Sequence, residues 1–184
     1  MSNISPIGRI SFPHLFKPQQ NDRGENTWSV VVVFDKKAQA TEEYKAMEAA
    51  IQSTAAERFG SKVPAGVKRK SLEPKSGYPI TSCDTKPDWF GWAPEGSTMI
   101  TFSSKYNPTI IDRNKQEILD AGDVYAGQYG RVQWTTYAYD ASGNQGVSFG
   151  LRAYQKVKDG DALSGGKPDL GAFKDLPDDE DDGI

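Results

Sequence analysis

Aromatic and basic side chains recur at every second position in the C-terminal half of the chain. Within residues 131–139 and 146–157, mostly apolar residues alternate with a set that includes arginine, tyrosine, glutamine and lysine. A period of two is typical of β-strands, whose successive side chains point to opposite faces. We therefore expect one apolar face and a second face that carries Arg131, Tyr137, Tyr139, Arg152, Tyr154 and Lys156.

This second face has the chemistry that unpaired nucleic acid requires. Arginine and lysine attract phosphates, and flat rings stack on bases, which contributes roughly 1–3 kcal/mol per base regardless of sequence. Because duplex DNA hides its base faces, a stacking surface selects single strands. The alternative is that tyrosine and arginine occupy exposed strands through β-propensity and cross-strand packing alone. Three tyrosines with three cations and no carboxylate favour binding over that alternative.

Two further groups are candidates for the same role. The first combines indole, phenol and amine side chains, and its members are Trp89, Trp92, Lys105 and Tyr106. Core packing explains each tryptophan equally well. The second lies in the basic stretch 61–77, where one glutamate opposes five cations, and its candidates for phosphate contacts are Lys68, Arg69 and Lys70.

The sequence gives little support to catalytic, metal or cofactor chemistry. The chain has one histidine, His14, and one cysteine, Cys83, which cannot together form a zinc site. No phosphate-binding G-x-x-x-x-G-K-[ST] pattern and no dinucleotide G-x-G-x-x-G pattern occurs. We therefore expect no catalytic residue, no metal and no cofactor.

Several strands must position the candidate side chains. Four consecutive valines within residues 28–34 predict a strand that is buried on both faces. Residues 98–102 also read as a strand, and the turn-forming residues 140–145 predict that 131–139 and 146–157 form a β-hairpin. Residues 7–16 read as an extended segment broken by prolines, and 109–112 as a short strand.

One helix is predicted, over residues 38–59. Its apolar residues recur at helical spacing, and Gly60 is well placed to end it. The stripe, which we expect to pack in the core, consists of Tyr44, Met47, Ile51, Ala55 and Phe59. The prolines and glycines of residues 61–88 predict a long loop.

Charge is divided unequally along the chain. There are 22 basic and 25 acidic residues, and the last ten residues, 175–184, hold six of the acids and no basic residue. Residues 1–174 therefore carry 22 basic and 19 acidic groups, a net charge of +3. We predict a domain over 1–164 and a disordered acidic C-terminal tail over 165–184, because its composition cannot bury enough apolar surface to fold. A tethered polyanion of this kind would compete with DNA for a basic groove.

The remaining composition indicates an intracellular protein. A single cysteine cannot form an intrachain disulfide, which favours a reducing compartment. The N-terminus lacks the basic and apolar regions of a signal peptide, and no apolar run approaches the roughly 20 residues that span a bilayer. We expect no membrane partner.

Five segments, in this order and spacing, resemble a family of bacteriophage single-stranded DNA-binding proteins long catalogued as a domain of unknown function. They are residues 9–18, 28–36, 122–128, 146–151 and 155–160. With the acidic terminus, the layout also resembles the replication single-strand binders of short-tailed phages.

The resemblance implies a mainly β protein with an OB-fold, a five-stranded Greek-key barrel with one inserted helix and long loops. It implies sequence-independent binding and protection of single-stranded DNA, without catalysis, in phage replication, recombination and repair within the cytoplasm of the bacterial host. It also implies a tail that recruits replication and recombination proteins, a role carried onto Asp178, Asp179, Glu180, Asp181, Asp182 and Ile184. Related proteins often form homodimers, but no residue here decides the oligomeric state.

Two other functions fit the same residues. A virion structural protein would use the hairpin aromatics to pack against other proteins. A DNA-processing enzyme would cleave or modify the strand that it binds.

Overall fold

Strands form the framework of the protein. The computed structural model describes residues 3–141, 143–163 and 172–176. Its sheet has the strand order β3-β4-β2-β1-β6-β7-β5. The long strands are β1 (Gly8–Gln20), β2 (Asn26–Phe34), β4 (Thr98–Ser104), β6 (Tyr129–Ala141) and β7 (Asn144–Lys158), and the short ones are β3 (Ile80–Ser82) and β5 (Thr109–Ile111).

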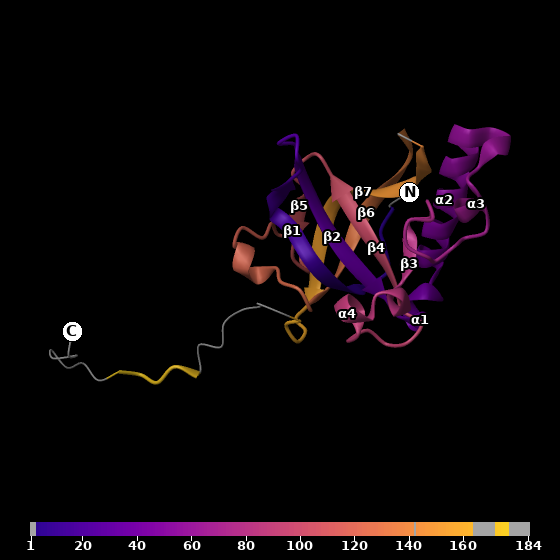
Figure 1. Ribbon diagram of the computed structural model, residues 1–184. Helices are drawn as coiled ribbons and strands as arrows, with labels where there is room; N and C mark the ends of the chain where they lie inside the picture. The colour runs from indigo at the N-terminus through magenta and orange to yellow at the C-terminus, as the bar shows by residue number, and fades with distance from the viewer. Residues whose placement is uncertain (1–2, 142, 164–171, 177–184) are drawn as a thin grey trace.

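The five long strands close into a barrel because β4 also pairs with β7. That pairing is parallel and places Phe102 opposite Phe149, whereas the other pairings within the barrel are antiparallel. The order around the barrel is therefore β1-β2-β4-β7-β6 and back to β1. The expected mainly β, five-stranded barrel is confirmed, and Figure 1 shows the long helix at one side of it.

The predicted burial of β2 on both faces is confirmed. Val30, Val32 and Phe34 lie in the main core of the barrel. Val31 and Val33 point outward and are covered by Cys83 and Phe90. The segment that carries Cys83 and Phe90 therefore covers part of the outer face of the barrel.

The helical segment begins with α1 (Lys36–Gln39) and continues as α2 (Glu42–Phe59). The two are separate because Thr41 has an extended backbone and its hydroxyl caps α2 by accepting a hydrogen bond from the Tyr44 N–H. Four residues of the predicted stripe are buried, and Phe59 packs against them. Gly60 ends α2 with a positive φ of 57°.

The expectation of a long loop over 61–88 is wrong. This segment contains α3 (Ala65–Lys68), β3 and α4 (Pro87–Phe90), together with short 3₁₀ turns at Gly60–Lys62 and Cys83–Thr85. Val67, Tyr78 and Ile80 are buried in the main core. The burial of these apolar residues fixes the segment despite its prolines and glycines. Within the described chain, one further 3₁₀ turn lies at Ala121–Asp123.

Strand β1 is longer than predicted and passes both prolines. Its register against β2 shifts between Ser11 and His14, and Phe12 within that shift has a φ of 47°. Such a bulge leaves a backbone position unpaired, which is where a strand tolerates a proline such as Pro13. The predicted short strand near residue 110 is confirmed as β5. None of the helices in the described ranges is long and apolar enough to cross a membrane.

Candidate nucleic-acid interface

A row of mostly small residues, with the larger His14 at one end, crosses the outer face of all five barrel strands. The pairing registers connect its members in sequence from β1 to β6: His14, Ser29, Ser103, Gly150 and Thr135. Their chain neighbours Leu15, Val30, Phe102, Phe149 and Trp134 are buried in the core, so the row itself faces outward. With strands about 4.8 Å apart, the row is about 19 Å long when measured around the barrel. We call this row and the two grooves at its ends the trough.

At the β6 end of the row lies an open groove of about 880 Å³, the Tyr137 groove. Thr135, Gly150 and Ser103 form its floor, and the other lining residues are Thr27, Ser104, Lys105, Tyr106, Asn107, Tyr137, Leu151 and Arg152. Tyr106 is 82% exposed and Tyr137 is 46% exposed. The groove therefore joins two rings to the cations of Lys105 and Arg152, neither of which forms an ion pair with a described residue.

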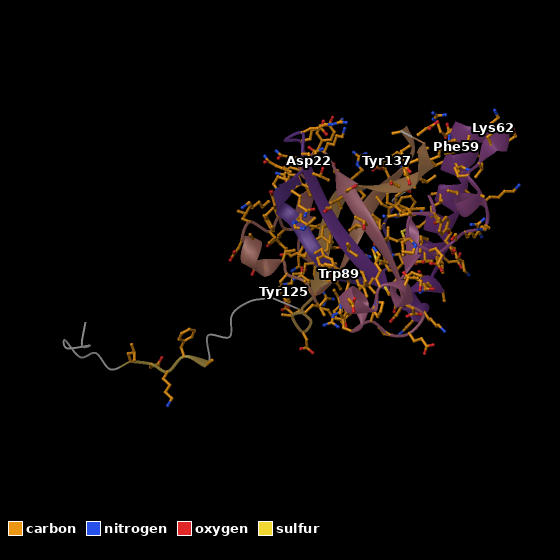
Figure 2. All side chains as sticks on the ribbon, in the orientation of Figure 1. Asp22, Phe59, Lys62, Trp89, Tyr125 and Tyr137 are labelled. Atoms are coloured by element: carbon orange, nitrogen blue, oxygen red, sulfur yellow. The ribbon has the colours of Figure 1, made fainter. Side chains whose placement is uncertain are left out.

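At the β1 end lies a second groove of about 590 Å³, the Trp89 groove. Its lining includes Phe12, His14, Trp89, Trp92 and Tyr125. Trp89 is 61% exposed, and its ring packs edge-on against Phe12 with centroids 5.5 Å apart. Figure 2 shows Trp89 and Tyr125 near one end of the barrel and Tyr137 near the other. The trough thus has exposed rings at both ends and a floor in which only His14 has a large side chain.

Trp92 packs more closely than Trp89. Its indole N–H donates to the Trp89 carbonyl at 3.1 Å, and the Arg9 guanidinium lies 5.0 Å from its ring. Arg9 itself donates to the carbonyl oxygens of Gly127 and Asp161. Arg9 and Trp92 therefore stabilise the wall of the groove, whereas the ring of Trp89 is exposed and accessible to a base.

The expected position of Tyr154 on the outer face is wrong. In the hairpin, Gln133 pairs with Ala153 but Trp134 pairs with Leu151, so Arg152 is an extra residue in β7. This bulge inverts the alternation of side chains beyond it. Tyr154 consequently points into the core, where its hydroxyl donates to the Gln128 side-chain oxygen at 2.8 Å. Burial raises the pKa of Tyr154 well above its usual range, and the ring is not accessible to a base.

Lys156 lies beyond the same bulge and is also largely buried. Its ammonium group donates to the Asp123 carbonyl at 3.0 Å and pairs with Asp159 at 2.8 Å. Its side chain is 19% exposed. Lys156 therefore links β7 to the turn before β6, and it is a poor candidate for a phosphate contact.

The two predicted arginines are separated by the fold. Arg152 lines the Tyr137 groove, whereas Arg131 lines a different groove and donates to the Gln155 side-chain oxygen at 2.8 Å. Arg131 and Tyr137 are six positions apart on β6, or about 20 Å. Tyr139 is half-buried, and it pairs with Gly146 near the hairpin turn. The outer face therefore carries the predicted chemistry only at its Tyr137 end.

The basic stretch lies beyond that end. Lys68, Arg69 and Lys70 are exposed at the end of α3, and α3 lies next to the long helix α2. Figure 2 places Lys62 at the far end of this helix, beyond Tyr137. The six tail residues assigned to partner binding, from Asp178 to Ile184, lie outside the described residues.

Phe12, His14 and Tyr125 were not among the predicted site residues. An apolar residue such as Phe12 within a predicted strand reads as core, and only the positive φ in β1 turns it outward. Tyr125 comes from an irregular segment with no periodic pattern. No signal in the sequence places these residues beside Trp89.

Comparison with known proteins gives the family of the chain. The model of a family described as Enterobacter phage Enc34, ssDNA-binding protein, matches residues 4–184. Protein p50 of Acyrthosiphon pisum secondary endosymbiont phage 1 is 30% identical over 159 residues, which are 86% of this chain and 84% of p50.

Solved structures share the fold. The single-stranded DNA-binding protein of bacteriophage Enc34 in complex with ssDNA has a TM-score of 0.69 at 20% identity, with 87% of this chain and 88% of that chain covered. The single-stranded DNA-binding protein gp2.5 of bacteriophage T7 has a TM-score of 0.62 at 12% identity, with 90% and 96% covered. The match along nearly the whole sequence shows that this chain belongs to the family of the Enterobacter phage Enc34 ssDNA-binding protein.

Proposed function

We propose that this protein binds single-stranded DNA without sequence preference and protects it during phage DNA replication, recombination and repair in the host cytoplasm. The observation that carries the proposal is the trough, which has exposed rings at both ends, two cations at the Tyr137 end and a floor of mostly small residues. Family membership supports the same function, because the family is described by its binding of single-stranded DNA. It also favours a binding protein over an enzyme.

Each part of the trough has a distinct role in this proposal. Tyr106 and Tyr137 stack bases at one end and Trp89, supported by Phe12, stacks them at the other. Lys105 and Arg152 neutralise phosphates beside the tyrosines. The small side chains of the floor let the strand lie close to the sheet. Lys68, Arg69 and Lys70 provide further phosphate contacts for DNA that extends past the hairpin.

Titration of intrinsic fluorescence with oligo-dT and with a matched duplex, at two salt concentrations, tests this function. Stacking on Tyr106, Tyr137 and Trp89 predicts quenching by oligo-dT and much weaker quenching by the duplex. Rising salt should weaken binding with a log–log slope of about −0.7 per neutralised phosphate. Equal affinity for the two nucleic acids, or no quenching, would contradict the proposal.

The tail and the oligomeric state complete the proposal. The six acids of residues 175–184 give the tail a charge pattern that suits recruitment of replication and recombination proteins. A homodimer is proposed on the resemblance to related proteins alone, because the outer edge of β3 is partly occupied where the Ser82 N–H donates to the Leu72 carbonyl at 2.9 Å. Sedimentation of the DNA-free protein tests the dimer.

A further inference from the structure

A third groove, of about 950 Å³, shares no lining residue with either trough groove. It is lined by the N-terminal segment, the start of the helical region and the ends of β6 and β7, and we call it the Arg131 groove. None of its cations forms an ion pair with a described residue, and they are Lys37, Arg113, Arg131 and Lys158. The function proposed above assigns no role to this groove.

The Arg131 groove stays positively charged after its carboxylates are counted. Asp35 and Glu43 oppose the four cations, so the lining has a net charge of +2. The Asp35 carboxylate is also engaged, because it accepts a hydrogen bond from the Ala38 N–H at the start of α1. The Arg131 guanidinium is held in place by donating to the Gln155 side-chain oxygen at 2.8 Å. The groove therefore attracts anions, and one of its cations is already positioned.

A small pocket of about 200 Å³ connects the Arg131 groove with the trough. On one side it shares Trp92 with the Trp89 groove. On the other side it shares Ile7, Asp35 and Tyr129 with the Arg131 groove, and Arg9 lines it in between. Shared lining residues therefore join the Trp89 groove, the connecting pocket and the Arg131 groove into one path around the end of the barrel.

Strand pairing explains this path. Arg9 of β1 pairs with Val33 of β2 and with Tyr129 of β6, and Tyr129 pairs in turn with Lys158 of β7. With strands about 4.8 Å apart, this second row is about 14 Å long around the barrel. The Arg9 guanidinium lies 5.0 Å from the Trp92 ring and 5.9 Å from the Tyr129 ring, and the Lys158 ammonium lies 4.7 Å from the Tyr129 ring. Cations therefore follow the whole path.

We propose that single-stranded DNA longer than the trough continues from the Trp89 groove past Arg9 into the Arg131 groove, which holds its phosphates. This inference rests on the proposed function and lengthens its binding site. At the 3.4 Å per nucleotide of one strand in a duplex, about six nucleotides cover the row of the trough. The second row and the Arg131 groove extend the site toward the upper part of the range of roughly 4–16 nucleotides for one OB-fold.

The Arg131 groove suits phosphates and not bases. Tyr129 is the one ring among its lining residues, and this ring is half-buried and flanked by the cations of Arg9 and Lys158. Bases therefore have no free ring to stack on, whereas all four cations of the groove are exposed. An acidic protein segment would meet the same charges. The continuous path favours DNA as the occupant, because a strand that lies in the Trp89 groove is already directed toward the Arg131 groove.

Oligo-dT of two lengths tests the proposal in the full-length protein. A strand of about six nucleotides fills the trough, and one of about 16 nucleotides reaches beyond it. Arg131→Gln with Lys158→Gln should lower the affinity for the long strand at least fivefold at low salt. Its log–log salt slope should become shallower by about 1.4, or 0.7 for each lost phosphate contact. Affinity for the short strand should stay within twofold of the parent protein, with an unchanged slope.

Two further double variants complete this test. Lys37→Gln with Arg113→Gln leaves the Arg131 hydrogen bond intact and should lower long-strand affinity at least threefold, again without affecting the short strand. Lys45→Gln with Lys115→Gln is the matched control, because both lysines are exposed and line neither the three grooves nor the connecting pocket. The control should change the binding of neither strand by more than twofold.

Disulfide trapping locates the strand directly. Glu43→Cys places a thiol in the Arg131 groove, and Glu57→Cys places one on α2 outside the grooves and the connecting pocket. Both variants lose one exposed carboxylate, and the native Cys83 does not interfere, because it is 2% exposed and burial raises its pKa to about 12. The probes are long and short oligo-dT with an activated disulfide at the 5′ or the 3′ end. One of the two long probes should join Glu43→Cys at least fivefold more than Glu57→Cys, and the short probes should not.

Three results would overturn the proposal: equal losses for the short and the long strand, no loss for the long strand, or equal cross-linking of Glu43→Cys and Glu57→Cys. An acidic protein segment as the occupant predicts the second of these results. Failure of the parent protein to bind oligo-dT of either length would instead contradict the proposed function itself.

Discussion

Tyr106, Tyr137 and Arg152 line one groove but should contribute to DNA binding by different physics. Stacking of a base on a ring depends little on salt, whereas neutralising a phosphate releases counterions. Replacing Tyr137 with alanine should therefore cost about 1–3 kcal/mol of binding free energy with no change in the salt slope. Arg152→Ala should make the slope shallower by about 0.7. Oligo-dT titrations at four salt concentrations measure both quantities.

Lys45 offers a matched control for Arg152, because it is exposed on α2 and lies in neither trough groove. Lys45→Ala should leave the slope unchanged. Identical slopes for Arg152→Ala and Tyr137→Ala would show that these two roles are assigned wrongly.

Tyr154 should matter for stability and not for DNA binding. Tyr154→Phe removes the hydroxyl that donates to Gln128, and leaves the oxygen of this buried amide without that donor. An unsatisfied buried acceptor costs about 1–3 kcal/mol. Urea unfolding should show this loss, while oligo-dT affinity stays within twofold of the parent protein. A tenfold loss of affinity in a folded variant would place Tyr154 in the interface after all.

The sequence predicts side-chain alternation but not where it is interrupted. Residue types correctly placed Tyr137 and Arg152 on the outer face and Val132, Trp134 and Phe149 in the core. The extra residue at Arg152 inverts the pattern, and nothing in its local sequence distinguishes a bulge from a regular strand. For that reason Tyr154 and Lys156 were expected on the wrong side.

At the scale of strands, added bulk or negative charge on the floor of the trough should weaken DNA binding. Ser103 is half-buried on the outer face of β4 and lies beside Gly150. Ser103→Glu should lower oligo-dT affinity at least tenfold, because it brings a carboxylate against the phosphates and fills the floor. Thermal unfolding should change little, since the new side chain points to solvent.

Gln133→Glu provides the control for this change. Gln133 is exposed on β6 and lies in neither trough groove. The same added charge should there alter affinity less than threefold. Equal losses for the two variants would mean that the DNA does not follow the row of small residues.

Long periodic elements were predictable, and the irregular connections were not. Four valines in β2 and the stripe of α2 are strong local patterns, and both are confirmed. In residues 61–88, Val67, Tyr78 and Ile80 are isolated apolar residues whose burial depends on contacts distant in sequence. The covering of β2 by Cys83 and Phe90 depends on such contacts too, and so does the formation of the Trp89 groove.

For the whole molecule, buried tyrosines should make the fold sensitive to alkali. Burial, only partly offset by the hydrogen bond to Thr98, raises the pKa of Tyr44 from 10.0 to about 12. The pKa values of Tyr78 and Tyr154 are also raised by burial. A group whose pKa is raised in the folded state contributes stability that is fully present below its unfolded-state pKa. This contribution is lost as the pH rises through its folded-state pKa. Stability should therefore fall between about pH 10 and pH 12.

Thermal unfolding across this range measures the effect. Tyr44 alone should account for about 2–3 kcal/mol, at 1.36 kcal/mol for each pKa unit. Tyr44→Phe should make the decline shallower, since phenylalanine has no group to ionise. A decline in stability of the same size in Tyr44→Phe would exclude ionisation of Tyr44 as its cause.

The net charge of the chain could be read from the sequence, but the distribution of the cationic side chains between two grooves could not. The net charge of +3 over residues 1–174 predicts attraction to a polyanion. It is the folding of the barrel that places Arg152 in the Tyr137 groove and Arg131 in a different groove. The protein therefore has two separate grooves with cationic side chains, and exposed tyrosine rings accompany the cations in the groove that contains Arg152.

The location of the DNA is the central claim, and ultraviolet cross-linking of the full-length protein to oligo-dT tests it most directly. Mass spectrometry of the digested complex identifies the residues joined to thymine. We predict cross-links at Tyr106, Tyr137 and Trp89, and none at Tyr129, which lines the same groove as Arg131. Cross-links concentrated at Tyr129, or elsewhere outside the trough, would contradict the account.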